Sequence, residues 1–273
     1  MDANRYAMAD LLRVMQRLRD PDYGCPWDLR QTFQSIVPST LEECYELAAT
    51  IESGDYQHMA EELGDVLFQV VFYSQLGREQ GLFSFESVVD SLVEKLVRRH
   101  PHVFADGAIE GVVRRRESLA SVAQSWEAIK QSERERKNQA GRLADVPLAL
   151  PALPRAQKLQ KRAAQAGFDW QNVTGVLDKL SEEVDELRSA LAEGSDAAID
   201  DELGDVLFTC VNLSRHLRRD AEGSLRQASS KFERRFRAME SIAEQQGLAL
   251  EALDSDALDR LWCAAKAAEG EGL

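Results

Sequence analysis

Cysteine is scarce in this sequence and never paired at short spacing. The four cysteines among 273 residues are scattered, with no C-x-x-C pair that could bind a metal or cycle between thiol and disulfide. We therefore expect reduced thiols, and Cys44 and Cys210 lie in apolar helical patterns that predict small buried side chains. A signal segment and an apolar run long enough to cross a membrane are also lacking. These absences predict a cytoplasmic protein with no membrane partner.

Strand-like alternation of apolar and polar residues is absent, and proline is rare, with seven residues. Leu, Ala, Glu, Arg and Gln abound instead, which favours an all-α chain. A length of 273 residues allows one or two domains. The net charge of −14 makes a nucleic-acid duplex a poor partner, because the protein would repel the phosphates. The sequence contains no G-x-x-x-x-G-K-[ST] loop and no Ser-His-Asp or Cys-His arrangement, which disfavours P-loop and covalent chemistry.

One acidic pattern, E-E-x-x-E followed by E-x-x-D, occurs once in each half of the chain. The second copy consists of Glu182, Glu183, Glu186, Glu202 and Asp205. The first copy lies 140 positions earlier at every acid and consists of Glu42, Glu43, Glu46, Glu62 and Asp65. A single E-E-x-x-E is usually a solvated helix face. Recurrence in register beside apolar blocks favours a functional site instead.

The spacing of these acids predicts a metal site. Residues three or four apart share one face of a helix, so Glu183 with Glu186 and Glu202 with Asp205 form two pairs that can converge from two antiparallel helices. An all-carboxylate set suits hard cations, Mg²⁺ first and Mn²⁺ next. A di-iron carboxylate bundle would need Glu-x-x-His pairs, which the sequence lacks. A spare carboxylate such as Glu182 could accept the proton of a metal-activated water.

Cationic and aromatic residues repeat as well, at an offset of 136. The motif Lys95-x-x-Arg98-Arg99 corresponds to Lys231-x-x-Arg234-Arg235, and Trp126-x-x-x-Lys130 corresponds to Trp262-x-x-x-Lys266. Lys and Arg suit phosphate oxygens and a Trp could pack against a base, so these residues are candidates for nucleotide binding. A solvated helix face for the cations and core packing for Trp262 are the alternatives.

The repeat spans nearly the whole chain and predicts two tandem domains. Residues 137–152 form the expected linker between domain 1–136 and domain 153–273. They are polar at first and then contain Pro147 and Pro151, with Pro154 shortly after. Capping-box spacing at Ser39 and Thr40 predicts that the helix with the first E-E-x-x-E begins there. Periodicity predicts further helices near 5–19, 56–79, 85–99, 155–166, 177–191, 197–217, 224–246 and 261–266.

Both halves resemble the MazG-type nucleoside triphosphate pyrophosphohydrolases, an all-α family marked by E-E-x-x-E followed by E-x-x-D. The likeness covers essentially the whole chain and includes the segments 24–28 (GCPWD), 98–104 (RRHPHVF) and 231–236 (KFERRF). The resemblance implies Mg²⁺-dependent cleavage of ribo- and deoxyribonucleoside triphosphates to the monophosphate and pyrophosphate, with a broad base range. It also implies a homodimer of four-helix-bundle units.

The resemblance further assigns roles to single residues. The metal ligands would be Glu183, Glu186, Glu202 and Asp205 in the C-terminal copy, with Glu43, Glu46, Glu62 and Asp65 as their N-terminal counterparts. Nucleotide contacts would come from Lys179, Lys231, Arg235, Trp262 and Lys266, beside Arg234 of the same basic group. Position 39, opposite Lys179, is Ser39, and His100-Pro101 ends the first basic helix early. The C-terminal copy is therefore the better catalyst candidate, and the alternative is a regulatory module that binds Mg²⁺ and nucleotide with little turnover.

Overall fold

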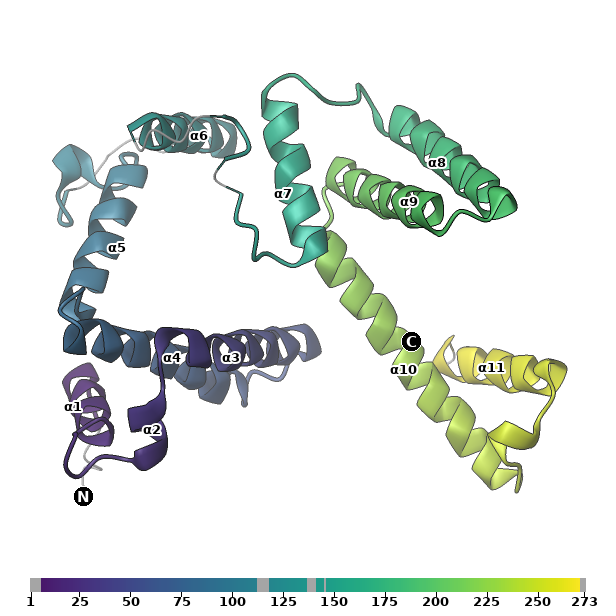
Figure 1. Cartoon of the computed structure of the whole chain (residues 1–273), viewed down its shortest axis with the longest axis horizontal. Coiled ribbons are helices and arrows are strands. Elements are labelled where there is room, and N and C mark those ends of the chain that lie inside the picture. The colour runs from purple at the N-terminus through teal and green to yellow at the C-terminus, as the bar shows by residue number, and fades with distance from the viewer. Residues whose placement is uncertain (1–5, 112–117, 137–140, 145, 271–273) are drawn as a thin grey trace. The chain divides into compact units, whose positions relative to one another are not determined.

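The computed structural model describes residues 6–111, 118–136, 141–144 and 146–270. Every regular element within these ranges is a helix and none is a strand, which confirms the all-α prediction (Figure 1). The first half contains α1 (Met8–Leu18), α2 (Pro26–Arg30), α3 (Phe33–Ser53), α4 (Met59–Glu79), α5 (Phe85–Arg99), η1 (Ala105–Gly107) and α6 (Leu119–Arg136). The second half contains α7 (Ala152–Gln165), α8 (Val173–Glu193), α9 (Asp196–His216), α10 (Ala221–Gln245), η2 (Leu250–Ala252) and α11 (Ser255–Gly270). Within the described ranges, no helix combines the length and the apolar character needed to cross a membrane.

The chain divides into an N-terminal unit, residues 1–131, and a C-terminal unit, residues 132–273. The division falls inside α6, a few residues before the expected linker 137–152. Residues 137–140 and 145 of that linker lie outside the described residues, and α7 starts at its last position, Ala152. Each unit contains one copy of the acidic pattern.

The N-terminal unit is built on the helical hairpin of α3 and α4, with α1 and α5 packed against α4. Arg19 closes one side of the interior: its guanidinium carbon lies 5.5 Å from the centroid of the Phe72 ring, and its Nη2 pairs with Glu79 at 2.6 Å. The residues of the core are all at most 3% exposed and consist of Met15, Ile36, Val71, Phe72 and Leu76. The interior of this unit is therefore filled by its own side chains.

The helix that carries the first E-E-x-x-E starts earlier than Ser39, so the predicted start is wrong. Helix α3 begins after Thr32, whose hydroxyl accepts a hydrogen bond from the Ser35 N–H at 3.2 Å, while the Ser35 hydroxyl oxygen accepts one from the Thr32 N–H at 2.8 Å. Pro38 lies inside the helix, where proline removes one backbone hydrogen bond and normally ends a helix. The reciprocal cap and the tertiary packing of α3 outweigh that cost, so the helix continues through the proline.

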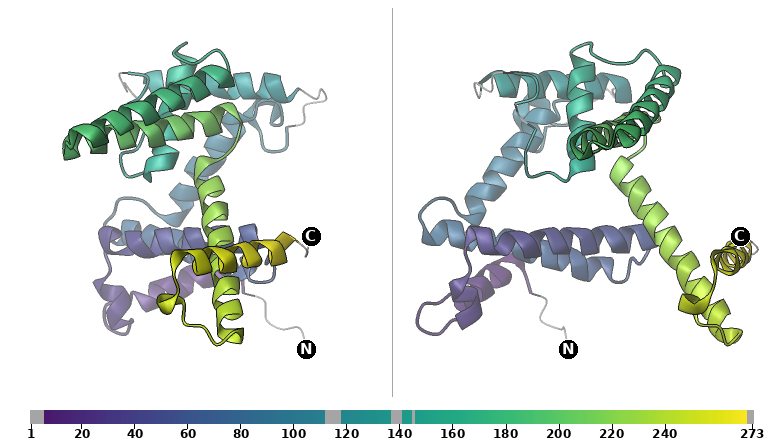
Figure 2. Two further views of the ribbon diagram at one scale, coloured as in Figure 1. Left: turned by 90° about the vertical axis from the view of Figure 1, so that its right-hand side faces the viewer. Right: turned by 45° about the vertical axis from the view of Figure 1, so that its right-hand side comes forward.

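The C-terminal unit repeats the hairpin with α8 and α9, which lie side by side in Figure 1 and in both views of Figure 2. Gly54 ends α3 and Gly194 ends α8, at φ of +73° and +72°, the left-handed cap that glycine adopts without strain. Helix α7 packs on α9, and α10 contacts both before it extends away to carry α11. The α10–α11 pair has a small core of its own, and a closed four-helix bundle in each repeat stays a prediction.

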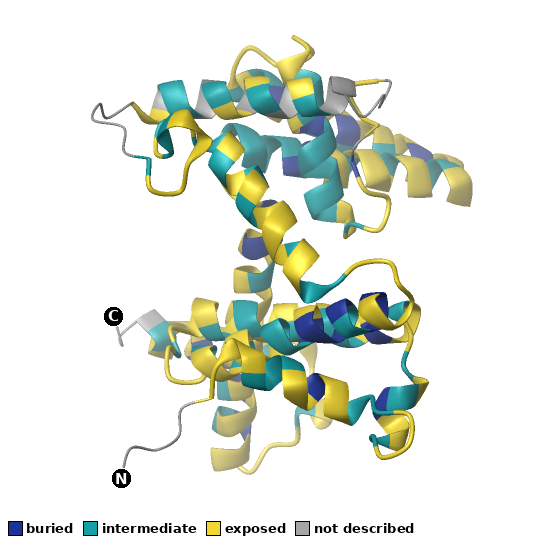
Figure 3. Cartoon of the chain, turned by 90° about the vertical axis from the view of Figure 1, so that its left-hand side faces the viewer, coloured by how far each residue is buried: buried dark blue, intermediate teal, exposed yellow. Residues whose placement is uncertain are grey.

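Apolar residues remain exposed on both hairpins, and most residues of the helices are exposed or partly exposed in Figure 3. Leu41 on α3 and Leu207 on α9 are each 53% exposed. Cys44 and Cys210 are also exposed, so the prediction of buried thiols is wrong. The reason is that two paired helices cover only one face of each other, and both cysteines lie on an uncovered face.

Candidate active site

The carboxylates of the second acidic pattern converge between α8 and α9. Glu183 and Glu186, three residues apart on α8, and Glu202 of α9 each offer an oxygen, and these oxygens lie within 4.8 Å of one another. Glu183 is only 5% exposed. Asp205 follows Glu202 by one turn of α9, although its oxygens are not part of this close group. Carboxylates at such separations repel one another, so the centre needs a cation.

Lys179 supplies one positive charge from the preceding turn of α8. Its Nζ lies 2.7 Å from Glu182, 3.1 Å from Glu183 and 3.8 Å from Glu186. Hydrogen bonds to Glu182 and Glu183 raise the pKa of Lys179 above its ordinary value, so the ammonium stays charged. Hydrogen bonding with Glu183 raises the pKa of Glu186 and burial raises it further, while Lys179 opposes both effects. The negative charge of the centre is therefore only partly balanced by the chain itself.

The donor set fits a divalent metal ion. The close group contains carboxylate oxygens from Glu183, Glu186 and Glu202, with no thiolate or imidazole, which selects hard cations. Oxygens bound to one Mg²⁺ at about 2.1 Å lie at most about 4.2 Å apart, so the group closes on an ion with small side-chain movements. Asp205 stays a predicted fourth ligand.

The first acidic pattern forms a matching centre between α3 and α4. Oxygens of Glu43, Glu46 and Glu62 lie within 4.8 Å of one another. Burial and then the Asp65 charge raise the pKa of Glu43, and burial and then the Glu46 charge raise the pKa of Glu62. Ser39 stands 140 positions before Lys179, and the three glutamates form no ion pair with any residue that the structure describes. This centre therefore presents the same ligands without an ammonium group among them.

A cavity of about 670 Å³ adjoins the C-terminal centre and is lined in part by Lys179 and Glu183. Aromatic side chains from the segment before α8 and from α9 form one part of its wall, namely Phe168, Trp170 and Phe208. Gly175 lets the indole approach α8, because a Cβ at this position would lie 3.0 Å from the Trp170 ring. The cavity thus joins an apolar, aromatic space to the charged centre.

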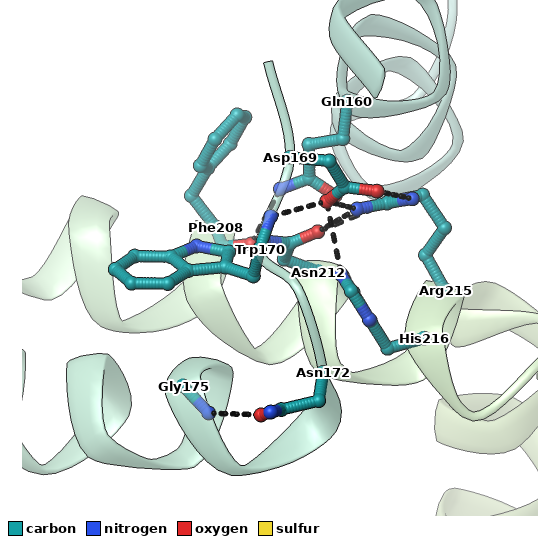
Figure 4. A network of polar contacts seen from close by, with 9 residues as sticks. All are labelled: Gln160, Asp169, Trp170, Asn172, Gly175, Phe208, Asn212, Arg215 and His216. Carbon is teal, nitrogen blue, oxygen red and sulfur yellow. Dashed lines mark hydrogen bonds and ion pairs between the residues drawn. The ribbon is translucent and has the colours of Figure 1, made fainter. Parts of the chain in front are cut away.

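Asp169 organises the polar part of the cavity wall (Figure 4). Its carboxylate accepts hydrogen bonds from both terminal nitrogens of Arg215, with Nη1 at 3.0 Å, and lies 2.9 Å from Nε2 of His216. Arg215 also donates to the side-chain oxygen of Asn212, from Nε at 3.1 Å and from Nη2 at 2.7 Å. The Arg215 hydrogen bonds lower the pKa of Asp169 to about 2, against the opposing effect of burial. This network fixes the orientation of Asn212 in the wall.

The other five residues predicted to bind nucleotide lie on α10 and α11. Glu269 of α11 pairs with two of them, Arg234 at 3.1 Å and Arg235 at 2.6 Å. Trp262 lies against Phe232, with ring centroids 5.3 Å apart, and packs on the α10–α11 core. The remaining two, Lys231 and Lys266, are exposed. Figure 1 shows α11 beside the C-terminal half of α10 and away from α8 and α9, so only Lys179 of the six lies at the carboxylates in the described chain.

Sequence reasoning missed the polar wall of the cavity, although a signal was present. Asn212, Arg215 and His216 interrupt an otherwise apolar stretch of α9 at helical spacing. The residues 140 positions earlier are Phe72, Gln75 and Leu76. A comparison of the two repeats at these positions would have marked the second as the one with a polar pocket.

Fold and site together define a class of all-α proteins in which a duplicated helical hairpin carries a cluster of carboxylates. The family model described as "MazG nucleotide pyrophosphohydrolase domain" matches twice, at residues 31–104 and 171–239. The chain belongs to the MazG nucleotide pyrophosphohydrolase family, as its sequence resemblance predicts. It is accordingly a hydrolase of phosphoanhydride bonds.

Relatives match along most of the chain. The nucleoside triphosphate pyrophosphohydrolase of Escherichia coli is 47% identical over 256 residues, which cover 92% of this chain and 94% of that protein. The nucleoside triphosphate pyrophosphohydrolase/pyrophosphatase MazG of Thermotoga maritima is 43% identical over 257 residues, which cover 94% of each chain. The nucleoside triphosphate pyrophosphohydrolase of Mycolicibacterium smegmatis is 36% identical over 196 residues, which cover 69% of this chain and 57% of that one.

Proposed function

We propose that the C-terminal unit hydrolyses ribo- and deoxyribonucleoside triphosphates to the monophosphate and pyrophosphate, with Mg²⁺ as its cofactor and a broad range of bases. The observation that carries this proposal is that the carboxylate centre and the cavity share two residues, Glu183 and Lys179. These residues belong to the carboxylate centre and also line the cavity of about 670 Å³. A polyphosphate held at the centre would therefore have its nucleoside beside an aromatic space.

The chemistry follows from the residues of the centre. Glu183, Glu186, Glu202 and Asp205 would hold Mg²⁺, which when bound neutralises phosphate charge and makes a water ligand more acidic; Mn²⁺ is a possible substitute. Glu182 is more exposed than Glu183 and would accept the proton of the attacking water. The water oxygen forms a bond to one of the two phosphorus atoms that share the oxygen between the α- and β-phosphates. The bond from that phosphorus to the shared oxygen breaks. The products are nucleoside monophosphate and pyrophosphate.

The cavity suits a nucleoside because its walls combine aromatic faces with hydrogen-bonding groups. Trp170 and Phe208 offer surfaces on which any base can stack, which agrees with a broad base range. Asn212, fixed by Arg215, offers a polar group near the base or sugar. Nucleotide contacts by Trp262, Lys231, Arg234, Arg235 and Lys266 stay a prediction, because α11 lies away from the carboxylates of α8 and α9 in this structure.

Dimerisation is part of the proposal, because both hairpins leave apolar side chains uncovered. Leu203 and Leu207, one turn apart on α9, are 45% and 53% exposed, and Phe232 on α10 is 58% exposed. Exposed apolar patches of this kind mark protein–protein contacts. A homodimer would cover them. A cytoplasmic location and the lack of a nucleic-acid partner stay predictions.

The experiment is product analysis. Purified protein is incubated with each NTP and dNTP plus Mg²⁺, and the products are separated; nucleoside monophosphate and pyrophosphate in equal amounts are expected. Nucleoside diphosphate and phosphate would contradict the proposed bond cleavage. Bound nucleotide without any product would favour the alternative, a regulatory module that binds Mg²⁺ and nucleotide. For the N-terminal unit, one observation favours this regulatory alternative: the cavity described above adjoins the C-terminal carboxylates, not the N-terminal ones.

A further inference from the structure

Lys179 occupies an unusual position for a residue that would contact substrate phosphate. Its ammonium nitrogen lies within 4 Å of three carboxylates, and its closest contacts are 2.7 Å to Glu182 and 3.1 Å to Glu183. The lysine side chain is 29% exposed, so its charge is partly shielded from water. A positive group of the chain therefore lies among two of the carboxylates that would hold the metal.

We propose that Lys179 is an internal counter-cation that opposes binding of a free divalent ion and moves to the polyphosphate when a nucleotide arrives. The inference rests on the proposed function and adds an order of loading to it. An ammonium group and a divalent ion among the same oxygens repel each other, since like charges a few ångströms apart interact strongly in partly shielded surroundings. Polyphosphate offers Lys179 a new anionic partner, so metal and nucleotide each favour the binding of the other.

The N-terminal unit provides the internal contrast. Ser39 stands at the position of Lys179, and the group of Glu43, Glu46 and Glu62 contains no ammonium among the described residues. Its affinity for a free divalent ion should therefore not depend on nucleotide. The serine also supplies the matched substitution for the experiment.

The test measures binding of Mn²⁺ to the full chain by the loss of the free-ion EPR signal. Glu43→Gln with Glu46→Gln silences the N-terminal centre, so that only the C-terminal centre is observed. In this background Lys179→Ser should bind Mn²⁺ about tenfold more tightly without nucleotide, and Lys179→Arg, which keeps the charge, should change affinity little. A non-hydrolysable NTP analogue should increase the Mn²⁺ affinity of the background variant that keeps Lys179. The increase should be smaller in the variant with Lys179→Ser. Equal or weaker Mn²⁺ binding by Lys179→Ser, or no binding by either protein, would overturn the inference.

The reciprocal variant uses the other centre. With Glu183→Gln and Glu186→Gln in place, Ser39→Lys should weaken Mn²⁺ binding at the N-terminal centre by a similar factor, and an unchanged affinity would count against the inference. Failure of the proposed function gives a different result, namely the expected Mn²⁺ affinities with no pyrophosphate release. Pyrophosphate release together with unaltered Mn²⁺ affinity in Lys179→Ser would overturn the role of Lys179 alone.

Discussion

The two units carry the same carboxylate centre in different surroundings. In the C-terminal unit a cavity of about 670 Å³ adjoins Glu183 and Lys179. In the N-terminal unit the positions that correspond to the cavity wall belong to a filled interior. Phe72, which is fully buried, stands where the second unit has the wall residue Asn212. Leu76, at 2% exposure, stands where the second unit has His216, which lies beside the wall and contacts Asp169. The N-terminal unit thus has the same group of carboxylates, while a buried aromatic ring occupies the position of the wall residue Asn212.

Under the proposed function, metal ligation and nucleotide binding would depend on separate features of one hairpin. The carboxylates need only helical spacing on two paired helices, which both units have. The polar part of the cavity wall on α9 includes Asn212 and Arg215, which the Asp169 network orients. One unit can therefore lose the second feature and keep the first.

The largest effect is expected when the filled interior is opened. Phe72→Asn replaces a fully buried ring with a smaller polar group, so it creates a cavity and leaves an amide without partners. We expect the free energy of unfolding of the N-terminal unit to fall by about 4 kcal/mol. Urea denaturation measures this free energy. Leu82→Asn is the control, because Leu82 is 64% exposed and the substitution there creates no cavity. A loss below about 1 kcal/mol would show that the interior is not filled as described.

The reciprocal change tests the cavity. Asn212→Phe introduces the side chain of the first unit into the wall, so it should exclude the nucleoside and lower kcat/KM for NTPs about 100-fold. Steady-state kinetics measure this loss, and Mn²⁺ binding without nucleotide should be unchanged because the carboxylates are untouched. Wild-type kcat/KM in Asn212→Phe would place the nucleoside elsewhere.

A smaller effect is expected at the network that supports the cavity. The pKa of Asp169 is lowered to about 2 from 3.8, so its stabilisation is present above pH 3.8 and is lost as pH falls towards 2. Asp169→Asn should lower the free energy of unfolding at pH 7 by about 2 kcal/mol and remove that acid dependence. Denaturation from pH 7 to pH 2 measures both. Asp185→Asn, which breaks the exposed pair with Arg188, is the matched control and should have little effect.

The smallest effect concerns charge in the N-terminal centre. The pKa of Glu62 is raised above 4.5, so the folded unit holds a proton that the unfolded chain releases, and stability falls as pH rises through the raised value. Glu62→Gln should flatten this decline in thermal melts between pH 4 and pH 7. Mg²⁺ should flatten it in the unaltered protein, because the ion replaces the proton. The same slope in Glu62→Gln and the parent protein would contradict this account.

The helices and the carboxylate centre could be predicted because they depend on local sequence. Glu183 and Glu186 share a face through helical spacing alone, and the second hairpin repeats the first at an offset of 140. The start of α3 was harder to predict from the sequence. Pro38 suggests that no helix passes through it, whereas the true cap, Thr32, lies on its N-terminal side. Local preference is the wrong guide where packing holds a helix together.

Comparison of the repeats marks the polar residues of the cavity wall, but the contacts that form the cavity and the exposure of the thiols could not be predicted, because they depend on which faces meet in space. Asp169 reaches Arg215 across 46 positions of sequence, and no periodicity reports such a contact. Cys210 lies in an apolar pattern, but the residue is exposed on α9. Trp262 fits both alternatives of the sequence analysis, since it packs on the α10–α11 core and remains partly exposed.

The central claim is that the C-terminal unit performs catalysis and the N-terminal unit does not. Pyrophosphate release from each NTP with Mg²⁺ should be compared between Glu183→Gln/Glu186→Gln and Glu43→Gln/Glu46→Gln, both in the full chain and with folding verified by circular dichroism. We expect the C-terminal pair to lower kcat by about 1000-fold or more, because the metal is lost, and the N-terminal pair to change it by about twofold at most. Equal losses in the two double variants, or a loss only in the N-terminal pair, would contradict the account.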